Sequence, residues 1–292
     1  MMYDLIEITP KMNKKKVIIV SIITILVVSF FTIMGIEFAK HSKGNIKNNT
    51  VAANEIISDN FYKTKHIANV NMNPSYTDTG KDLMNNIYHS QEKTVYLTFD
   101  DGPSKSVTPL ILDLLKQENI KATFFVLGAR AKSNPEILKR EYLEGHYIAN
   151  HGYSHIYGNI YSSPYAVLEE YNKTKDVIKE ILGTDYDGHL FRFPGGSTGG
   201  KYKQIKKDAK TILDENNIAY IDWNSLSNDA AGAKTKEAII QNTIDTVGNK
   251  NSVVILMHDA GDKILTYEAL PDIITYLREQ GYVFKNFYSV IK

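Results

Sequence analysis

Two adjacent carboxylates, Asp100 and Asp101, end the strand-like run in TVYLTFDDGPS. Side by side they repel each other, and burial at a strand end adds a desolvation cost. Two imidazoles, His151 and His155, lie further along the chain in NHGYSH. Two neutral imidazoles and one carboxylate make a three-ligand site for a divalent ion, with positions left open for water. Asp101 can supply that carboxylate; the cation would then offset the repulsion, and Asp100 would stay free as a base.

Other polar groups follow the ends of other strand-like runs. They are Arg192 in LFRFPGG, Asp222 beside Trp223 in IAYIDW, Asp229 soon after it, and His258 at the end of VVILMH. The carboxyl ends of the strands of a β/α barrel meet at one face, where active sites form. Each group alone is more often an ordinary surface, core or ion-pair residue. Their shared position at strand ends is what indicates a catalytic site.

The elements that must position these groups alternate regularly from residue 94 onward. The predicted strands are VYLTF, TFFVLG, YIAN, LFRF, IAYIDW, VVILMH and YVF, and the predicted helices cover 107–118, 135–144, 164–182, 203–216, 235–247 and 267–279. This alternation is typical of a parallel β/α architecture. The continuous apolarity of VVILM fits a strand buried on both faces. A barrel fits the pattern better than an open sheet.

The N-terminal part predicts a membrane anchor. Residues 17–36 carry no charge and are long enough to span the hydrocarbon core, and lysines at 11 and 14–16 precede them. The chain is therefore divided into a short cytoplasmic basic segment (1–16), a single transmembrane helix (17–36), a polar, flexible extracytoplasmic spacer (37–92) and a catalytic domain (93–292). The alternative is a secreted protein released by cleavage of a signal peptide. Met1 and Met12 both remain candidate start residues.

Composition excludes several classes of protein and site. The chain has no cysteine, so disulfides, cysteine-ligated zinc and a thiol nucleophile are excluded. Its net charge of +1 gives no reason to expect a nucleic acid partner. We expect a monomer that contacts the membrane through residues 17–36.

Five motifs in a fixed order carry a family resemblance. They are TFDDGP at 98–103, H-x-x-x-H at 151–155, R-x-P-x-G at 192–196, Asp229, and L-x-H at 256–258. In this order they resemble the NodB-type polysaccharide deacetylases, carbohydrate esterase family 4, and among these the membrane-anchored bacterial peptidoglycan N-acetylglucosamine deacetylases. The resemblance covers residues from about 93 to the C-terminus. It implies a deformed (β/α)7 barrel and one divalent ion, zinc by preference, which cobalt or another divalent ion can replace.

The same resemblance implies a role for each motif residue. The metal ligands would be Asp101, His151 and His155; Asp100 would be the base, Arg192 its orienting partner, His258 the general acid and Asp229 the group that tunes it; Gly195 would give an oxyanion N–H and Leu256 would line the acetyl pocket. Trp223, the sole tryptophan, is assigned either to the substrate pocket or to the core. His146 is interpreted as a structural histidine, because the three-ligand set is complete without it.

The chain departs from the family pattern at three positions. Gly152 stands where Ser or Thr usually follows the first histidine, which removes a hydrogen bond from the metal loop. Gly195 stands where an aromatic residue usually forms a wall of the groove. In the fourth motif only the second acid, Asp229, is present, and Ala230 replaces its tryptophan.

The function predicted from these features is removal of N-acetyl groups from peptidoglycan N-acetylglucosamine, which would make the wall resistant to lysozyme. The alternative substrates are N-acetylmuramic acid and poly-N-acetylglucosamine or chitin-like oligomers. An O-acetyl xylan esterase would use the same machinery. A catalytically inactive wall-binding domain is a further alternative, and an aspartate-dependent phosphatase would have no use for the two histidines.

Overall fold

The computed structural model describes residues 73–183 and 185–291, which belong to one compact unit, Met72–Lys292. The predicted transmembrane segment, the residues before it and most of the predicted spacer lie outside the described residues. Within the described part of the chain, no helix is both long and apolar enough to cross a membrane.

The described strands form one parallel sheet in the order β5-β4-β3-β2-β1-β7-β6, and β8 pairs with the first half of β1. Their bounds are β1 Thr94–Asp100, β2 Thr123–Val126, β3 Tyr147–Asn150, β4 Leu190–Phe191, β5 Ala219–Tyr220, β6 Ser225–Leu226, β7 Ser252–His258 and β8 Val283–Lys285. The sheet is curved, and among the described residues no ladder joins its two end strands, β5 and β6, so it forms a half-barrel rather than a closed barrel. The predicted parallel α/β architecture is confirmed, and the arrangement is consistent with a deformed (β/α)7 barrel.

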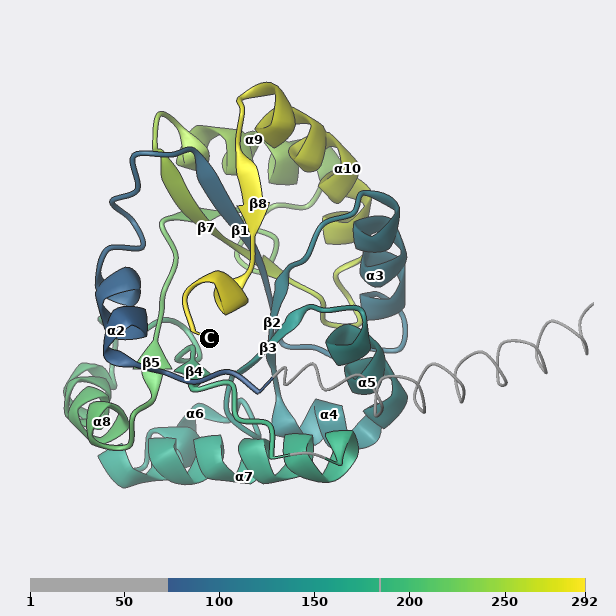
Figure 1. Cartoon of the computed structure of the whole chain (residues 1–292). Helices are drawn as coiled ribbons and strands as arrows, with labels where there is room; N and C mark the ends of the chain where they lie inside the picture. Colours follow the sequence, from purple (N-terminus) through teal and green to yellow (C-terminus); the bar gives the residue numbers. More distant parts are fainter. Residues whose placement is uncertain (1–72, 184, 292) are drawn as a thin grey trace, which may run out of the picture. The chain divides into compact units, whose positions relative to one another are not determined.

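Helices surround this curved sheet (Figure 1). Their bounds are α2 Asp78–Asn85, α3 Thr108–Gln117, α4 Gly128–Ser133, α5 Pro135–Leu143, α6 Tyr157–Ile160, α7 Pro164–Leu182, α8 Lys203–Glu215, α9 Lys236–Val247 and α10 Ile264–Glu279, with a 3-10 turn at Phe287–Ser289. Helix α7 shows why the longer helices were predictable: Ser163 caps it by accepting from the Ala166 N–H, and Gly183 ends it at a φ of 63°. Helix α10 begins at Ile264, before the predicted residue 267. No capping side chain marks its start, so the sequence carries no signal for the first residue of this helix.

Strand β1 is the centre of the core, and all seven of its residues are buried. Its side chains alternate between two faces. Leu97 and Phe99 pack in a cluster with residues of α3 and α10, whereas Tyr96 packs in a second cluster with Phe287 near the C-terminus. By the same alternation Thr98 and Asp100 share the face of Tyr96, inside the curve of the sheet.

Residues 73–92 belong to the folded unit, although the sequence analysis assigned them to the spacer. Met84 and Ile87, in and just after α2, are buried in the cluster that contains Tyr96. The Asn217 side chain donates to the Tyr76 carbonyl oxygen at 3.0 Å, and the Ser252 hydroxyl donates to the Ile87 carbonyl oxygen. The folded unit therefore begins well before residue 93.

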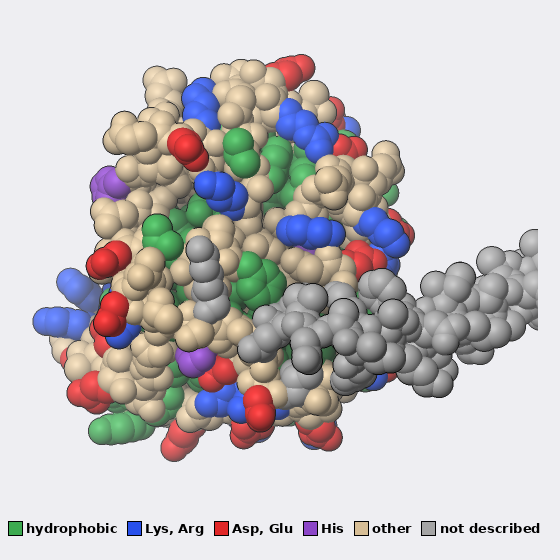
Figure 2. Space-filling model, in the orientation of Figure 1, with side chains coloured by type: hydrophobic (Ala, Val, Ile, Leu, Met, Phe, Trp, Pro, Cys, Tyr) green, Lys and Arg blue, Asp and Glu red, His purple; other side chains and the backbone are tan. Residues whose placement is uncertain are grey.

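Positive and negative side chains are interspersed over the face shown in Figure 2, in keeping with the net charge of +1.

Candidate active site

Three ligand atoms converge beyond the ends of β1 and β3. Asp101 Oδ1 lies 3.7 Å from His151 Nε2 and 3.4 Å from His155 Nε2, and one ligand atom from each of the three residues lies within 4.8 Å of the others. Asp101 and His155 both have positive φ values, 73° and 56°, which are uncommon outside glycine. Their backbone conformation turns the chain sharply at each ligand, and such strained residues concentrate at functional sites.

The hydrogen bonds around these atoms leave a place suited to a cation. His151 Nδ1 lies 2.8 Å from the Arg192 carbonyl oxygen, so Nδ1 carries the hydrogen and the Nε2 lone pair faces Asp101. Asp101 Oδ1 is buried and has no hydrogen-bond partner among the described residues. Burial lowers the pKa of His151, against the opposing effect of the Asp100 and Asp101 carboxylates, which keeps the imidazole neutral. Two facing acceptors without a proton between them fit a divalent ion held by this donor set.

The loop that carries the two histidines is held by Glu170 from α7. Its Oε2 accepts from the backbone N–H groups of Tyr153 at 2.6 Å and Ser154 at 2.8 Å, and its Oε1 lies 3.1 Å from the Ser154 hydroxyl. The Asn150 side chain accepts from the Gly152 N–H at 2.9 Å. Gly152 has a φ of 81°, and a Cβ there would lie 2.9 Å from Ile160. The loop thus gains hydrogen bonds from other residues where Gly152 lacks a hydroxyl.

Asp100 lies beside this ligand set, with its Oδ2 3.8 Å from His151 Nε2, and its Oδ1 meets a fully buried arginine. Arg192 Nη1 donates to Asp100 Oδ1 at 2.7 Å and to Thr98 Oγ1 at 2.8 Å. The guanidinium carbon lies 3.9 Å from the centre of the Phe125 ring, and Nη2 and Nε donate to the carbonyl oxygens of Asp222 and Ile221. A charge-assisted bond in so fixed a frame sets the orientation of the Asp100 carboxylate.

On the neighbouring strand, His258 pairs in register with Asp100. Its Nδ1 lies 2.8 Å from Asp229 Oδ1, and Asp229 Oδ2 accepts from the His258 backbone N–H and the Thr266 hydroxyl, each at 2.8 Å. Burial lowers the pKa of His258, but the hydrogen bond and charge of Asp229, with the charges of Asp100 and Asp101, raise it to about 9. The imidazole is therefore protonated at neutral pH and can donate a proton.

The loop after β4 brings the Gly195 N–H to the surface. Gly195 is exposed with a φ of 71°, and its N–H donates to no acceptor among the described residues. Three groups hold this loop: Ser197 donates to Asp222 through its N–H at 2.8 Å and its hydroxyl at 2.7 Å, and Lys206 donates to the Gly196 carbonyl oxygen at 2.6 Å. A fixed loop with a free N–H can serve as an oxyanion donor.

The two predicted apolar substrate contacts lie in different environments. Leu256, in register with Thr98 on β1, is only partly buried, whereas its neighbours Ile255 and Met257 are fully buried. Trp223 is partly buried, packs beside the cluster that contains Tyr96, and lies 3.3 Å from the position of a Cβ on Gly196. Trp223 therefore packs against the loop that carries Gly195 and Gly196.

Asp259 was not predicted from the sequence to have a role in the site. Its side chain explains why the TFDDGP motif has a glycine, Gly102. Asp259 is fully buried, and its Oδ2 accepts from the Thr108 hydroxyl at 2.5 Å; the same hydroxyl accepts from the Ser104 N–H at 2.7 Å. A Cβ on Gly102 would lie 2.1 Å from Asp259 Oδ2, so only glycine fits. The acidic residue directly after His258 was the one available signal.

His146 lies outside the ligand set, as interpreted from the sequence. It is fully buried, and its Nδ1 accepts from the Ala122 N–H at 3.0 Å. Burial, with the charges of Lys121 and Arg140, lowers the pKa of His146 to about 3. It therefore links β2 to the loop before β3 as a neutral imidazole.

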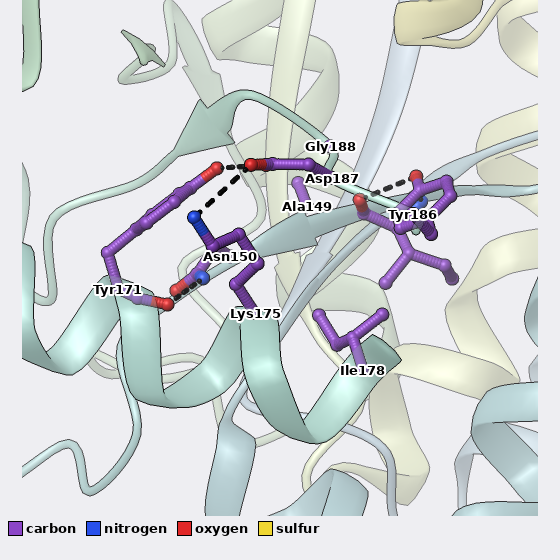
Figure 3. A pocket seen from close by; sticks show the side chains of 9 residues that line it. Ala149, Asn150, Tyr171, Lys175, Ile178, Tyr186, Asp187 and Gly188 are labelled. Atoms are coloured by element: carbon purple, nitrogen blue, oxygen red, sulfur yellow. Dashed lines mark hydrogen bonds and ion pairs between the residues drawn. The ribbon is translucent and has the colours of Figure 1, made fainter. Parts of the chain in front are cut away.

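A small pocket between β3 and α7 backs the histidine loop (Figure 3). Across it the Tyr171 hydroxyl donates to Asp187 at 2.5 Å, Lys175 lies 3.5 Å from the same carboxylate, and the Asn150 side chain donates to the Tyr171 carbonyl oxygen at 2.9 Å. These polar groups satisfy one another. Because Asn150 also accepts from the Gly152 N–H, the pocket is part of the frame that fixes the loop.

Comparison with known proteins finds similarity to polysaccharide deacetylases. The family model described as polysaccharide deacetylase matches residues 88–212. The YheN protein of Bacillus subtilis is 36% identical over 66% of this chain and 66% of its own length. A peptidoglycan-N-acetylglucosamine deacetylase of Bacillus cereus is 33% identical over 68% of this chain and 71% of its own length. The peptidoglycan-N-acetylmuramic acid deacetylase PdaA of Bacillus subtilis is 29% identical over 68% of this chain and 71% of its own length.

Solved structures agree with the sequence matches. A Streptococcus mutans CE4 esterase superposes with a TM-score of 0.64 at 30% identity, covering 73% of this chain and 92% of that one.

Proposed function

Because this chain belongs to the polysaccharide deacetylase family, carbohydrate esterase family 4, we propose that it hydrolyses the N-acetyl amide of N-acetylglucosamine in peptidoglycan. The products are acetate and a free amino sugar. N-acetylmuramic acid in the same polymer is the second candidate, supported by the similarity to PdaA.

One observation carries the proposal: of the two neighbouring carboxylates, only Asp100 is bonded to Arg192 and only Asp101 faces both imidazoles. Asp101 Oδ1 faces two imidazole nitrogens and has no hydrogen-bond partner among the described residues, whereas Asp100 Oδ1 accepts from Arg192. A structural pair of acids would need no such division. Metal-assisted hydrolysis needs one acid as ligand and one as base.

We assign the ligand set to Asp101, His151 and His155, and the resident ion to zinc, with cobalt able to replace it. When bound, the ion supplies a Lewis acid that polarises the acetyl carbonyl and lowers the pKa of water. Asp100, oriented by Arg192, takes a proton from the water that attacks the acetyl carbon. The Gly195 N–H donates to the oxygen of the tetrahedral intermediate. His258 gives its Nε2 proton to the leaving nitrogen as the C–N bond breaks, and Leu256 contacts the acetyl methyl group.

The test is release of acetate from N-acetylglucosamine oligomers and from peptidoglycan by the purified full chain. Asp100→Asn keeps the shape of the side chain but removes its basicity. We expect metal content near wild type and kcat lower by about 10²–10⁴. Loss of the metal in Asp100→Asn, but not in Asp101→Asn, would show that the two acids have the opposite roles. Activity on acetylated xylan with none on either glucosamine polymer would contradict the peptidoglycan substrate.

We propose further that residues 17–36 anchor the chain in the membrane, with the folded unit on the outer side. A reporter fused after Lys292 should then lie outside the cytoplasm, and deletion through residue 36 should release active protein. A cytoplasmic reporter would contradict this topology, and a mature N-terminus near Ala39 would support the secreted alternative.

A further inference from the structure

Another side chain already fills the space beside Gly195, where the family pattern has an aromatic residue. A Cβ on Gly195 would lie 2.3 Å from Tyr157 Oη and 3.2 Å from Tyr157 Cζ. Such distances are not compatible with any side chain at position 195 unless Tyr157 moves. The glycine and the tyrosine are therefore a matched pair, although they lie in different segments of the chain.

Tyr157 is fixed in this position by aromatic neighbours. It is the first residue of α6, and its ring centre lies 5.7 Å from that of His155, 5.6 Å from that of Tyr161 and 6.2 Å from that of Tyr202. Tyr161 is buried and donates through its hydroxyl to the Pro194 carbonyl oxygen at 2.7 Å. The aromatic cluster is thus tied to the loop that carries Gly195.

The free surface of Tyr157 suits a sugar ring. The residue is 40% exposed although it is packed on three aromatic or imidazole rings. Its hydroxyl makes no hydrogen bond with any residue that the structure describes, so it is free to donate to a ligand. An apolar ring face with a free polar tip is the type of side chain that binds amphipathic ligands.

We propose that Tyr157 is a substrate-contacting residue that replaces the aromatic wall absent at Gly195. Its ring packs against the sugar that bears the acetyl group, and its hydroxyl donates to a polar oxygen of that sugar. This inference rests on the proposed function, since it assumes an acetylated glycan as substrate.

The test compares Tyr157→Ala and Tyr157→Phe with Tyr165→Ala in the full chain, using acetate release from N-acetylglucosamine oligomers. Tyr165 is a suitable control because it is 67% exposed on the next helix and outside the aromatic cluster. We expect KM to rise about tenfold in Tyr157→Ala and about threefold or less in Tyr157→Phe, with kcat within about threefold of wild type. Tyr165→Ala should match wild type in both constants.

Two further measurements separate substrate contact from support of the metal loop. Metal content should be unchanged in Tyr157→Ala; loss of metal would place its role at His155 and overturn the inference. Gly195→Ala should raise KM less in the Tyr157→Phe background than in wild type, because the hydroxyl that meets the new Cβ is absent. An unchanged KM in Tyr157→Ala would also overturn the inference that Tyr157 contacts the substrate.

Failure of the substrate assignment gives a different result. If wild type acts only on acetylated xylan, the peptidoglycan assignment fails, and the same variants are measured with xylan. The inference about Tyr157 then stands or falls on the KM ratio for that glycan.

Discussion

Replacing Asp229 with asparagine tests how His258 is kept protonated. Oδ2 of Asp229 accepts from the His258 backbone N–H and from the Thr266 hydroxyl, so this position needs an oxygen. The NH2 group of the asparagine would then face His258 Nδ1, which carries a hydrogen in the imidazolium form. Loss of the charge and this clash of two donors both disfavour the protonated imidazole.

The magnitude follows from the pKa of His258. At a pKa of about 9, about 99% of the imidazole is protonated at pH 7 and about half at pH 9. At the ordinary value of 6.5, these fractions fall to about 24% and about 0.3%. Because the proton donor must be charged, kcat/KM should fall about fourfold at pH 7 and about 150-fold at pH 9.

The assay is the pH profile of kcat/KM for acetate release. Activity should decline as pH rises through the pKa of His258, and this decline should begin two to three pH units lower in Asp229→Asn, by the same estimate of about 9 against 6.5. Thr266→Val is the matched control: it removes one hydrogen bond to Asp229 but leaves the charge, so the profile should move by less than about one unit. A loss in Asp229→Asn that is the same at every pH would refute the role assigned to the carboxylate.

Three further outcomes are expected. His155→Ala should lose the divalent ion on dialysis, measured by elemental analysis, whereas His89→Ala, at an exposed site, should retain it; full occupancy in His155→Ala would remove that residue from the site. Glu170→Ala should weaken metal affinity about tenfold or more by releasing the histidine loop, and the exposed neighbour Glu169→Ala should not; equal affinities would show that the loop holds without the carboxylate. The folded pKa of His146 is lowered to about 3 from 6.5, so the stability that its neutral form contributes is fully present above pH 6.5 and is lost toward pH 3 by up to about 1.4 kcal/mol per pH unit. When the free energy of unfolding is measured by urea at a series of pH values, it should fall less steeply with decreasing pH in His146→Gln than in wild type. The same pH dependence in both proteins would contradict the assignment.

The fold was predictable where the sequence carries a strong period or a cap. The long apolar runs of β1 and β7 and the capped helix α7 were assigned nearly to the residue. The elements that were missed are short: β6 has two residues, and α4 and α6 have no capping side chain. Elements of this size are fixed by neighbours in space, so local sequence gives little signal for them.

The site was predictable in outline for a different reason. Parallel strands bring their carboxyl ends to one face, so strand-end residues converge even when the strand limits are inexact. The supporting residues were not predictable in this way. Glu170 reaches the histidine loop from α7, and Tyr157 fills the space at Gly195 from the start of α6. Such compensation depends on three-dimensional proximity, which one sequence does not display.

The departure at the fourth motif illustrates the same point. Ala230 replaces the tryptophan of the family pattern and is exposed, yet Asp229 still meets both the backbone and the ring of His258. Thr266, from α10, completes the environment of its second oxygen. The remaining acid is therefore placed to raise the pKa of His258 without the tryptophan.

The electrostatic repulsion between Asp100 and Asp101 is reduced because the backbone turns between them and gives each carboxylate different partners. Asp100 ends β1 on the inner face of the sheet, where the buried guanidinium of Arg192 balances its charge. Asp101 takes a φ of 73° and leaves the strand, so its carboxylate turns to the imidazoles of the loop after β3. Consecutive residues on a regular strand would face opposite sides of the sheet, one of them packed among helices. The turn keeps both carboxylates on the active-site face with different partners, and this is the geometry that a ligand and a base for one water molecule require.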